Sequence, residues 1–500
     1  MTSAEPHPAF PAAAPSEPLP IVPKSSEGLW LAITSIADPN DIVTILSQIA
    51  AGVNQTGQNE NAKLRRGEDV LSMPEWNLED LGDENLHNMT AVLVFVLSAR
   101  SKNESFKTKA ASLSIFDLAV RLCNVGQPFQ FSACLNRVAI LAHEMVSIAR
   151  YLHKDEEVIA PLYTLLQRAV GPGVFSGAHT AFLEAVLIAR KSFRLARPVA
   201  DSIFVDFHTA SPSYVDILSF YLHGGTIAAA QGDYEHARNL FTIAVVAPSH
   251  GVSAIQQQCA KRAILCEMIV SGKLLKFPRY TSQSVGRLID KDKSIETYVK
   301  YAKLYEQRDW ERVESMRSNR LFKDDQNLGL VTRVVASIPK KRIANLKDVY
   351  TKMTVRDVAH ALGMQQDDAC VRTEAILQDM IASGNISASI IKGADAVSSV
   401  VVFHDADDPA ISARALAEIQ QINALSEFLE RQLSSAYREI GASAAYLKKQ
   451  SETQKMRGAG GGNGGGGGRL DDFESMVMNE EPTRGLSGGK VGADMSDIGY

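Results

Sequence analysis

Apolar residues between about 86 and 320 recur every three or four positions, in segments of about 12 to 18 residues. Glycine or proline interrupts the pattern between segments, as in NVGQP at 124–128, GPG at 171–173 and QGD at 231–233. The alternating pattern typical of strands is nearly absent from this region. The sequence therefore predicts a mostly α fold in which 86–320 forms a helical-repeat solenoid.

One unit within this region has the pattern of a tetratricopeptide-like hairpin. Gly225 and Ala237 are small enough to let two antiparallel helices approach closely, and Phe241 is placed to fill the space beside them. Weaker copies lie around Ala160 and Ala196, at spacings that suit irregular helical pairs better than a strict repeat. We therefore predict a right-handed, TPR-like solenoid.

The pattern changes in 321–405, where helical segments are followed by two short strands. Thr354 and Asp357 fit a capping box at the start of a short helix that Gly363 ends, and a second helix is predicted over 367–383. The alternating ISASI and the apolar VSSVVVFHD then predict two paired strands. Helices followed by a two-stranded hairpin predict a winged helix, an architecture that many proteins use to read DNA.

Two apolar features lack an obvious partner within the chain. In 406–456 apolar residues step by four and three along a long helix, which is typical of a helix that bundles with others. VSSVVVF is apolar on both faces, and a two-stranded wing leaves an edge to which another chain can add a strand. The predicted partner-contacting residues are Ile419, Ile422, Leu429, Leu433 and Ile440 of the helix and Val400, Val402 and Phe403 of the strand.

The remaining segments are polar or of low complexity. Prolines crowd 1–27, the segment 28–85 fits a short helix plus a polar linker, and 457–500 is Gly-rich and acidic. We expect 1–27 and 457–500 to be disordered. No run approaches the roughly 20 apolar residues of a membrane helix. With five sparse cysteines and no targeting pattern, we expect a cytoplasmic and nuclear protein.

Motif spacing argues against an enzyme. The eleven histidines form no HxH or HxxxH pair, so we expect no metal site and no other cofactor. The GxSxG match at 485–489 lies in a Gly-rich tail without the strand and helix that expose a nucleophile. His404 and Asp405 are adjacent in a strand and face opposite sides, while Cys259 and Cys266 have the spacing of one buried helix face. We expect no catalytic residue.

Charge bears on whether the winged helix binds nucleic acid or protein. In the second predicted helix, four acidic residues oppose one arginine, and the resulting −3 disfavours entry into a DNA groove. The segment 333–356 instead has seven basic residues against one acid, a face that a nucleic-acid-binding adaptor could use. We favour protein contact, because a charge run is more often solvated or paired with an acidic protein.

Helical repeats that lead into a winged helix resemble the PCI domain, which is found in scaffold subunits of the proteasome lid, the COP signalosome and a translation-initiation complex. Three stretches go further: KFPRYTSQSVGRLI at 276–289, DDQNLGLV at 324–331 and SSVVVFHD at 398–405. In this order and spacing they are similar to the family of third subunits of the COP signalosome.

That resemblance implies a non-catalytic subunit of an assembly that removes the ubiquitin-like modifier Nedd from cullins and regulates cullin-RING ubiquitin ligases. It implies that the partners are other signalosome subunits, joined through winged-helix edges and a bundle of C-terminal helices, with cullin-RING ligases as further candidates. The hydrolytic zinc then belongs to another subunit. A proteasome-lid or translation-initiation subunit, or a nucleic-acid-binding adaptor, stays as the alternative. The Pro-rich arm, the segment 53–85 and the tail depart from the family pattern.

Overall fold

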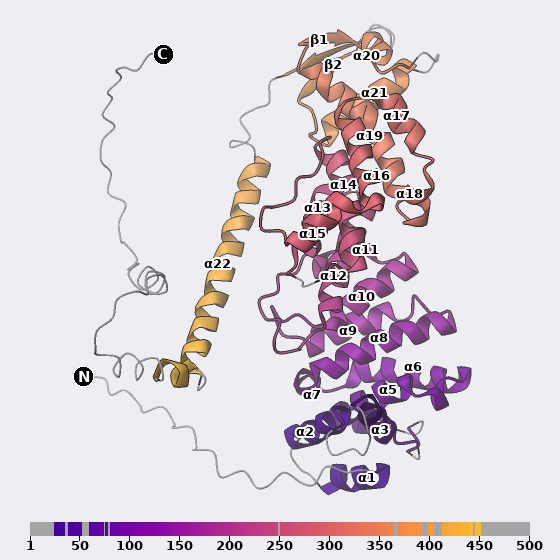
Figure 1. Ribbon diagram of the computed structural model, residues 1–500, viewed down its shortest axis with the longest axis vertical. Coiled ribbons are helices and arrows are strands. Elements are labelled where there is room, and N and C mark those ends of the chain that lie inside the picture. The colour runs from indigo at the N-terminus through magenta and orange to yellow at the C-terminus, as the bar shows by residue number, and fades with distance from the viewer. Residues whose placement is uncertain are drawn as a thin grey trace, which may run out of the picture. The chain divides into compact units, whose positions relative to one another are not determined.

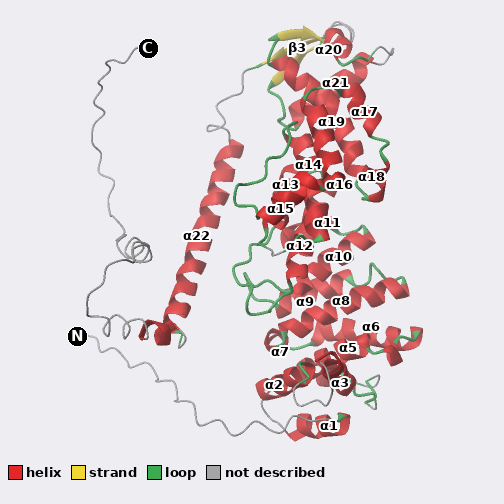
Figure 2. Cartoon of the chain, in the orientation of Figure 1, coloured by secondary structure: helices red, strands yellow, loops and turns green. Residues whose placement is uncertain are grey.

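A computed structural model of the chain describes residues 25–35, 39–52, 60–74, 76–78, 81–248, 251–364, 369–392, 399–404, 413–443 and 446–451. They are mostly helical, with one small sheet (Figure 1, Figure 2). The described residues up to His404 form one unit, and helix α22 (Ala413–Ala442) belongs to a second. The Gly-rich tail and nearly all of the Pro-rich arm lie outside the described residues. No described helix combines the length and apolar character that a bilayer crossing requires.

The first unit begins as a stack of helices (Figure 1), which confirms the helical repeats predicted from periodicity. In chain order its first half consists of α1 (Ser26–Ser35), α2 (Pro39–Ala50), α3 (Glu60–Ser72), α4 (Asp83–Asn88), α5 (Thr90–Lys102), the 3-10 turn η1 (Glu104–Phe106), α6 (Lys109–Val125), α7 (Pro128–Ala133), α8 (Leu135–Leu152), α9 (Ile159–Ala169), α10 (Gly177–Ala189) and α11 (Phe193–Ala200).

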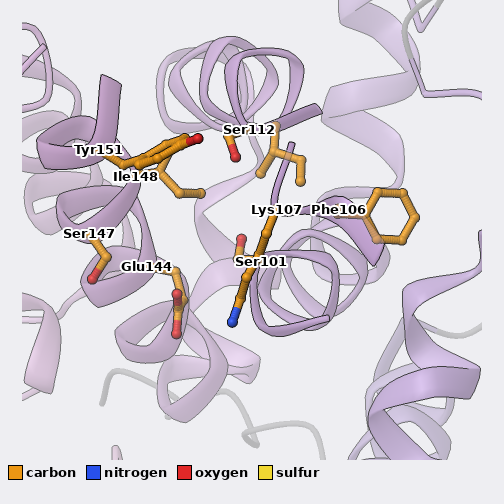
Figure 3. Close-up of a pocket in the computed structure, with 9 residues that line it drawn as sticks. Ser101, Phe106, Lys107, Ser112, Glu144, Ser147, Ile148 and Tyr151 are labelled. Carbon is orange, nitrogen blue, oxygen red and sulfur yellow. The ribbon is translucent and has the colours of Figure 1, made fainter. Parts of the chain in front are cut away.

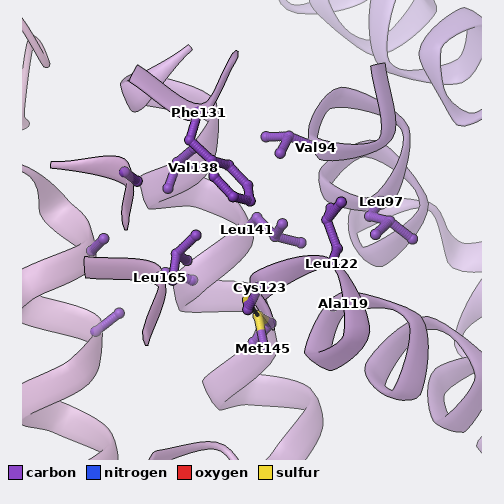
Figure 4. Packing of buried hydrophobic residues seen from close by; sticks show 14 of the residues in the cluster. Val94, Leu97, Ala119, Leu122, Cys123, Phe131, Val138, Leu141, Met145 and Leu165 are labelled. Atoms are coloured by element: carbon purple, nitrogen blue, oxygen red, sulfur yellow. Dashed lines mark hydrogen bonds between the residues drawn. The ribbon is translucent and has the colours of Figure 1, made fainter. Parts of the chain in front are cut away.

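Helix α5 lies at the centre of the N-terminal core. Its residues 90–100 are all buried, because α3, α6 and α8 pack against different sides of it. Val94 and Leu97 of α5 share one apolar cluster with Leu122 of α6 and Leu141 of α8 (Figure 4). The apolar run MTAVLVFVLSA, which begins at Met89, therefore forms a core helix.

The prediction of a polar linker within 28–85 is wrong for residues 60–72, which form helix α3. Leu71 is buried, and the Glu68 carboxylate accepts two hydrogen bonds from the Arg137 guanidinium at 2.8 and 3.2 Å. Arg100 of α5 donates to the carbonyl oxygens of Ser72, the last residue of α3, and Met73, the next residue, at 2.7 and 2.6 Å. A segment with few apolar residues is thus ordered by buried arginines from distant helices.

Helices α12 (Tyr214–Ala230) and α13 (Tyr234–Val246) form the predicted hairpin. A Cβ at Gly225 would lie 2.6 Å from the Phe241 ring, so only glycine allows this approach. Gly232 turns the chain between the helices with φ of +87°, a conformation that side chains rarely adopt. Ala237 and Phe241 are fully buried, as expected from their positions in the pattern.

A second core continues the stack and carries the winged helix. Its helices are α14 (Ala254–Val270), α15 (Gln283–Lys291), α16 (Lys293–Glu306), α17 (Trp310–Met316), α18 (Arg320–Asp324) and α19 (Leu328–Lys347). Fully buried aromatic rings from α16 and α18 fill it: Tyr298, Tyr301 and Phe322.

A polar network centred on Asp325 joins these helices. The Asp325 carboxylate accepts hydrogen bonds from Lys261 of α14, at 2.9 Å to each oxygen, and from the Tyr298 hydroxyl of α16 at 2.9 Å. Asn327 donates to the same Tyr298 oxygen at 3.0 Å and accepts from Arg262 at 3.1 Å. The stretch DDQNLGLV therefore supplies the groups that connect α14 and α16 to the start of α19.

The winged helix is built on α19, α20 (Val355–Ala361) and α21 (Ala369–Ala382), with strands β1 (Lys352–Thr354), β2 (Ala388–Ile391) and β3 (Val400–Phe403). Thr354 caps α20 by accepting from the Asp357 N–H at 3.1 Å, as predicted. The predicted two-stranded wing is wrong in its number of strands, because the sheet has three antiparallel strands in the order β1-β3-β2. Lys352 and Met353 end the stretch KKRIANLKDVYTKM, whose pattern predicts a helix, but residues 352–354 pair with β3.

The Asp325 network generates a stability prediction. Asp325→Ala leaves the buried Lys261 ammonium, 4% exposed, without its carboxylate, and we expect the free energy of unfolding to fall by about 3 to 5 kcal/mol. Urea unfolding followed by circular dichroism measures this. The control is the neighbouring Asp324→Ala, whose exposed carboxylate pairs with Arg320 at the surface and should change stability by no more than about 0.5 kcal/mol. Equal effects of the two substitutions would contradict the role given to Asp325.

A second prediction concerns pH. Burial lowers the pKa of His179 to about 4, while an unfolded histidine titrates near about 6.5. The unfolded chain therefore binds this proton first, and the free energy of unfolding falls between pH about 6.5 and about 4 by up to about 1.4 kcal/mol per unit. In His179→Gln, where the side chain cannot titrate, this part of the pH dependence should vanish. Urea unfolding of both proteins at several pH values tests it; parallel stability curves would rule it out.

Candidate protein-interaction surfaces

The sheet of the winged helix presents one face to its own core and one outward. Met353, Val401, Ile390 and Phe403 lie on the inner face, packed with the apolar residues of α20 and α21. The strand register places Val400 and Val402 on the other face, where Val400 lies between Thr354 and Ile391. Val400 and Val402 are half-buried, and Ile391 is 60% exposed. The outer face is therefore partly apolar.

This geometry corrects the expected role of β3 as an edge. Both sides of β3 are paired, and the edge strands of the described sheet are β1 and β2. Phe403, expected at a partner surface, is buried in the winged-helix core, whereas Val400 and Val402 keep a face toward solvent. Whether Val400 and Val402 contact another chain stays a prediction.

Sequence reasoning missed two exposed apolar residues beside the wing. Val349 and Tyr350 lie in the turn between α19 and β1 and are 71% and 47% exposed. Both lie in KKRIANLKDVYTKM (340–353), whose pattern predicts a continuous helix, whereas α19 ends at Lys347 and the chain changes direction there. The β-branched and aromatic residues around this point were the only available signal.

Helix α22, of 30 residues, carries the predicted partner-contacting residues Ile419, Ile422, Leu429, Leu433 and Ile440, called the seam below. All five predicted seam residues are exposed, with Ile422 at 63% and Leu433 at 58%. Leu416, Leu425, Phe428 and Tyr437 widen the exposed apolar surface beyond the predicted residues. No described residue of α22 from 416 onward is buried. The helix therefore presents an apolar stripe to solvent.

The basic face of 333–356 is partly used inside the protein. The Lys341 ammonium donates to the carbonyl of Val270 at 2.6 Å, and burial lowers its pKa. Arg342 donates to the carbonyl of Leu362 at 2.7 Å and lies over the Trp310 ring. Lys340 forms an ion pair with Asp379 of α21. Three of the seven basic residues are thus engaged within the protein: Lys340 and Arg342 inside the winged helix, and Lys341 and Arg342 with the helices before it.

Metal-ligating groups and cysteine thiols are the features of the described residues that bear most directly on catalysis. No group of three or more His, Cys, Asp or Glu side chains among them is placed to hold a metal ion. Cys123, Cys134, Cys259 and Cys266 are buried, and burial raises the pKa of each thiol to about 12, so none is a nucleophile near neutral pH. The predicted burial of Cys259 and Cys266 is confirmed. The exposed His404 ring contacts the Ser389 hydroxyl at 2.9 Å across the strands.

A small cavity lies between α6, α8 and the η1 turn (Figure 3). Its volume is about 210 Å³, and it is lined by Phe106, Ile148, Tyr151, three serines and Glu144. Burial raises the pKa of the Glu144 carboxyl. Lys107 also lines the cavity, and its ammonium pairs with Glu104. The volume lies below the roughly 300 Å³ at which ligand pockets begin.

Comparison with known proteins identifies what the repeats and the winged helix resemble. The family model described as "COP9 signalosome complex subunit 3, N-terminal helical repeats" matches residues 62–285, and the PCI domain model matches 304–405. The COP9 signalosome complex subunit 3 of Dictyostelium discoideum is 23% identical over 401 residues, which cover 78% of this chain and 93% of that protein. The protein of the same name from Drosophila melanogaster is 27% identical over 236 residues, covering 46% of this chain and 50% of its own length. The chain is therefore similar to COP9 signalosome complex subunit 3, with a match to that protein's helical repeats followed by a match to the PCI domain.

Proposed function

We propose that this chain is a scaffold subunit of the COP9 signalosome and has no catalytic activity of its own. The observation that carries the proposal is α22, a helix of 30 residues whose predicted seam is exposed along its length. An apolar stripe of this kind is stable in water only where other helices cover it. Other subunits of the same assembly are the partners that its family indicates.

The winged helix provides a second contact in this proposal. Its edge strands β1 and β2 and its outer face, with Val400, Val402 and Ile391, offer both backbone pairing and apolar contact. Joined to neighbouring subunits in this way, the chain supports removal of the modifier Nedd from cullins by a zinc site on another subunit. Cullin-RING ligases are further candidate partners, and we place the assembly in cytoplasm and nucleus.

The alternatives have less support. The family match to residues 62–285 is to signalosome subunit 3, not to a proteasome-lid or translation-initiation subunit. A nucleic-acid-binding adaptor would need the basic face of 333–356, and Lys340, Lys341 and Arg342 are engaged within the protein. Protein assembly is therefore the better use of this architecture.

The seam of α22 gives the main test. In the triple variant Ile422→Asp, Leu429→Asp and Leu433→Asp, carboxylates replace apolar groups that are already exposed, so the melting temperature of the isolated chain should stay within about 2 °C. Assembly with signalosome subunits should be lost, because the same carboxylates would be buried in a helix bundle. Co-purification with the other subunits and thermal unfolding of the isolated chain are measured together.

The matched control places three aspartates on the opposite side of the same helix, at Gln420, Ala424 and Ser435, which are exposed. This control should enter the complex normally. If the seam variant melts early yet still assembles, the helix stabilises its own chain and the proposal for α22 is wrong. If seam and control variants fail equally, added charge rather than the seam explains the loss.

The absence of catalysis is tested on the isolated chain. We expect less than one tenth of an equivalent of zinc per chain after purification without chelators, and no release of Nedd from a modified cullin. Elemental analysis and a cleavage assay, with the complete signalosome as positive control, measure both. One tightly bound zinc per chain, or cleavage by the isolated chain, would overturn the proposed scaffold role.

A further inference from the structure

The family-specific stretch KFPRYTSQSVGRLI has no role in the surfaces described above. It belongs to the loop between α14 and α15 and to the first turns of α15. No acidic residue occurs from 268 to 289, while four basic residues do. These are Lys273, Lys276, Arg279 and Arg287, and all four are exposed. The loop is therefore a local site of positive charge on a chain with a net charge of −5.

The base of this loop is fixed to the second core. Leu275 and Phe277 pack against that core, and Val285 at the start of α15 is buried. Lys341 of α19 holds the end of α14 through its hydrogen bond to the Val270 carbonyl. Inward apolar residues thus alternate with outward basic ones, so the loop presents its charges in a defined arrangement.

The tip of the loop is a tight turn over Pro278–Thr281. The Thr281 N–H donates to the Pro278 carbonyl at 3.1 Å, and the Thr281 hydroxyl donates to the same oxygen at 2.7 Å. Arg279 and Tyr280 occupy the middle of this turn. Tyr280 is 77% exposed, more than any other large apolar side chain of the described residues. An ordered turn therefore holds an arginine and a tyrosine out into solvent.

The four basic side chains make no hydrogen bond or ion pair with any other described residue whose side chain the structure places. Holding a tyrosine ring in water gains no burial, and clustered like charges repel each other, so this arrangement does not stabilise the isolated fold. Arginine and tyrosine are the residue types most enriched at the energetic centres of protein interfaces. The arrangement is suited to a partner.

We propose that the turn formed by Arg279 and Tyr280, with Lys273, Lys276 and Arg287 near it along the chain, is a docking site for an acidic segment of a partner protein that carries an apolar side chain among its carboxylates. The Tyr280 ring contacts the apolar side chain, and the Arg279 guanidinium binds a carboxylate with two hydrogen bonds. The surrounding cations attract the segment from solution.

An acidic protein fits this turn better than a nucleic acid does. Single-stranded nucleic acid is bound by a positively charged groove with several aromatic rings on which successive bases stack. Here Phe277 is turned inward, which leaves Tyr280 as the one ring displayed by the loop. A protruding turn with one ring matches one apolar side chain flanked by acids.

The test uses the full chain and a fluorescein-labelled peptide with three glutamates on each side of one phenylalanine. Fluorescence anisotropy at about 0.05 M and about 0.3 M salt should show binding that weakens with salt. Arg279→Glu and Tyr280→Ala should each raise the Kd about tenfold, and Tyr280→Phe should leave it within about twofold. The matched controls are Arg320→Glu, with the same change of net charge at an exposed site, and Tyr151→Ala; both should change the Kd less than twofold.

Other outcomes overturn the proposal. If Arg320→Glu weakens binding as much as Arg279→Glu, net charge and not this turn attracts the peptide. If the peptide does not bind, or a single-stranded oligonucleotide binds more tightly and is lost in the same variants, the site does not serve an acidic protein. The experiment needs no signalosome subunit, so its failure leaves the proposed scaffold role untouched.

Discussion

The Asp325 carboxylate is the group on which the connection between repeats and winged helix depends. It is placed in the short turn between α18 and α19 and accepts hydrogen bonds from α14 and α16, elements separated from it by 64 and 27 positions. Asn327, two residues later, extends the contacts to Arg262, whose guanidinium also donates to Thr226 of α12 at 2.7 Å. Buried charges of this kind are expensive to desolvate, and their hydrogen bonds are directional. Apolar packing alone would allow α19 to shift along the core, whereas these directional hydrogen bonds form in only one position of α19 relative to α14 and α16.

Local patterns in the sequence were sufficient for features whose causes are local. Gly225 and Phe241 predicted a close helix pair because the approach is set by side-chain size, and the spacing of Ile422, Leu429 and Leu433 predicted a helix with one apolar face. The cap at Thr354 was likewise readable, since donor and acceptor lie three residues apart. Each of these rests on neighbours along one or two helices.

The features that were missed have causes far away in the chain. Helix α3 is polar, and its Glu68 finds Arg137 at a separation of 69 positions, so its composition alone resembled a linker. The family match that begins at residue 62 includes this helix among the repeats. Strand β1 has only three residues, and its extended conformation depends on pairing with β3. This pairing places β1, where the sequence predicted β3, at an edge of the sheet. DDQNLGLV was recognised as a marker, but its hydrogen-bond partners were visible only in the fold.

The energetics of α22 indicate why one surface is insufficient for a scaffold. Burying a leucine or isoleucine completely is worth roughly 1.5 to 3 kcal/mol, and the five predicted seam residues are already about half covered by their own helix. The remaining gain is therefore about 4 to 8 kcal/mol, similar to the roughly 4 to 15 kcal/mol that association costs in lost freedom. A helix with this seam is a weak binder when it acts alone. If the wing of the same chain is already bound to the assembly, binding of α22 becomes intramolecular. Most of the free-energy cost of lost translational and rotational freedom is then avoided. In the proposed scaffold role, two modest apolar surfaces on one chain would thus hold a subunit more firmly than either surface alone.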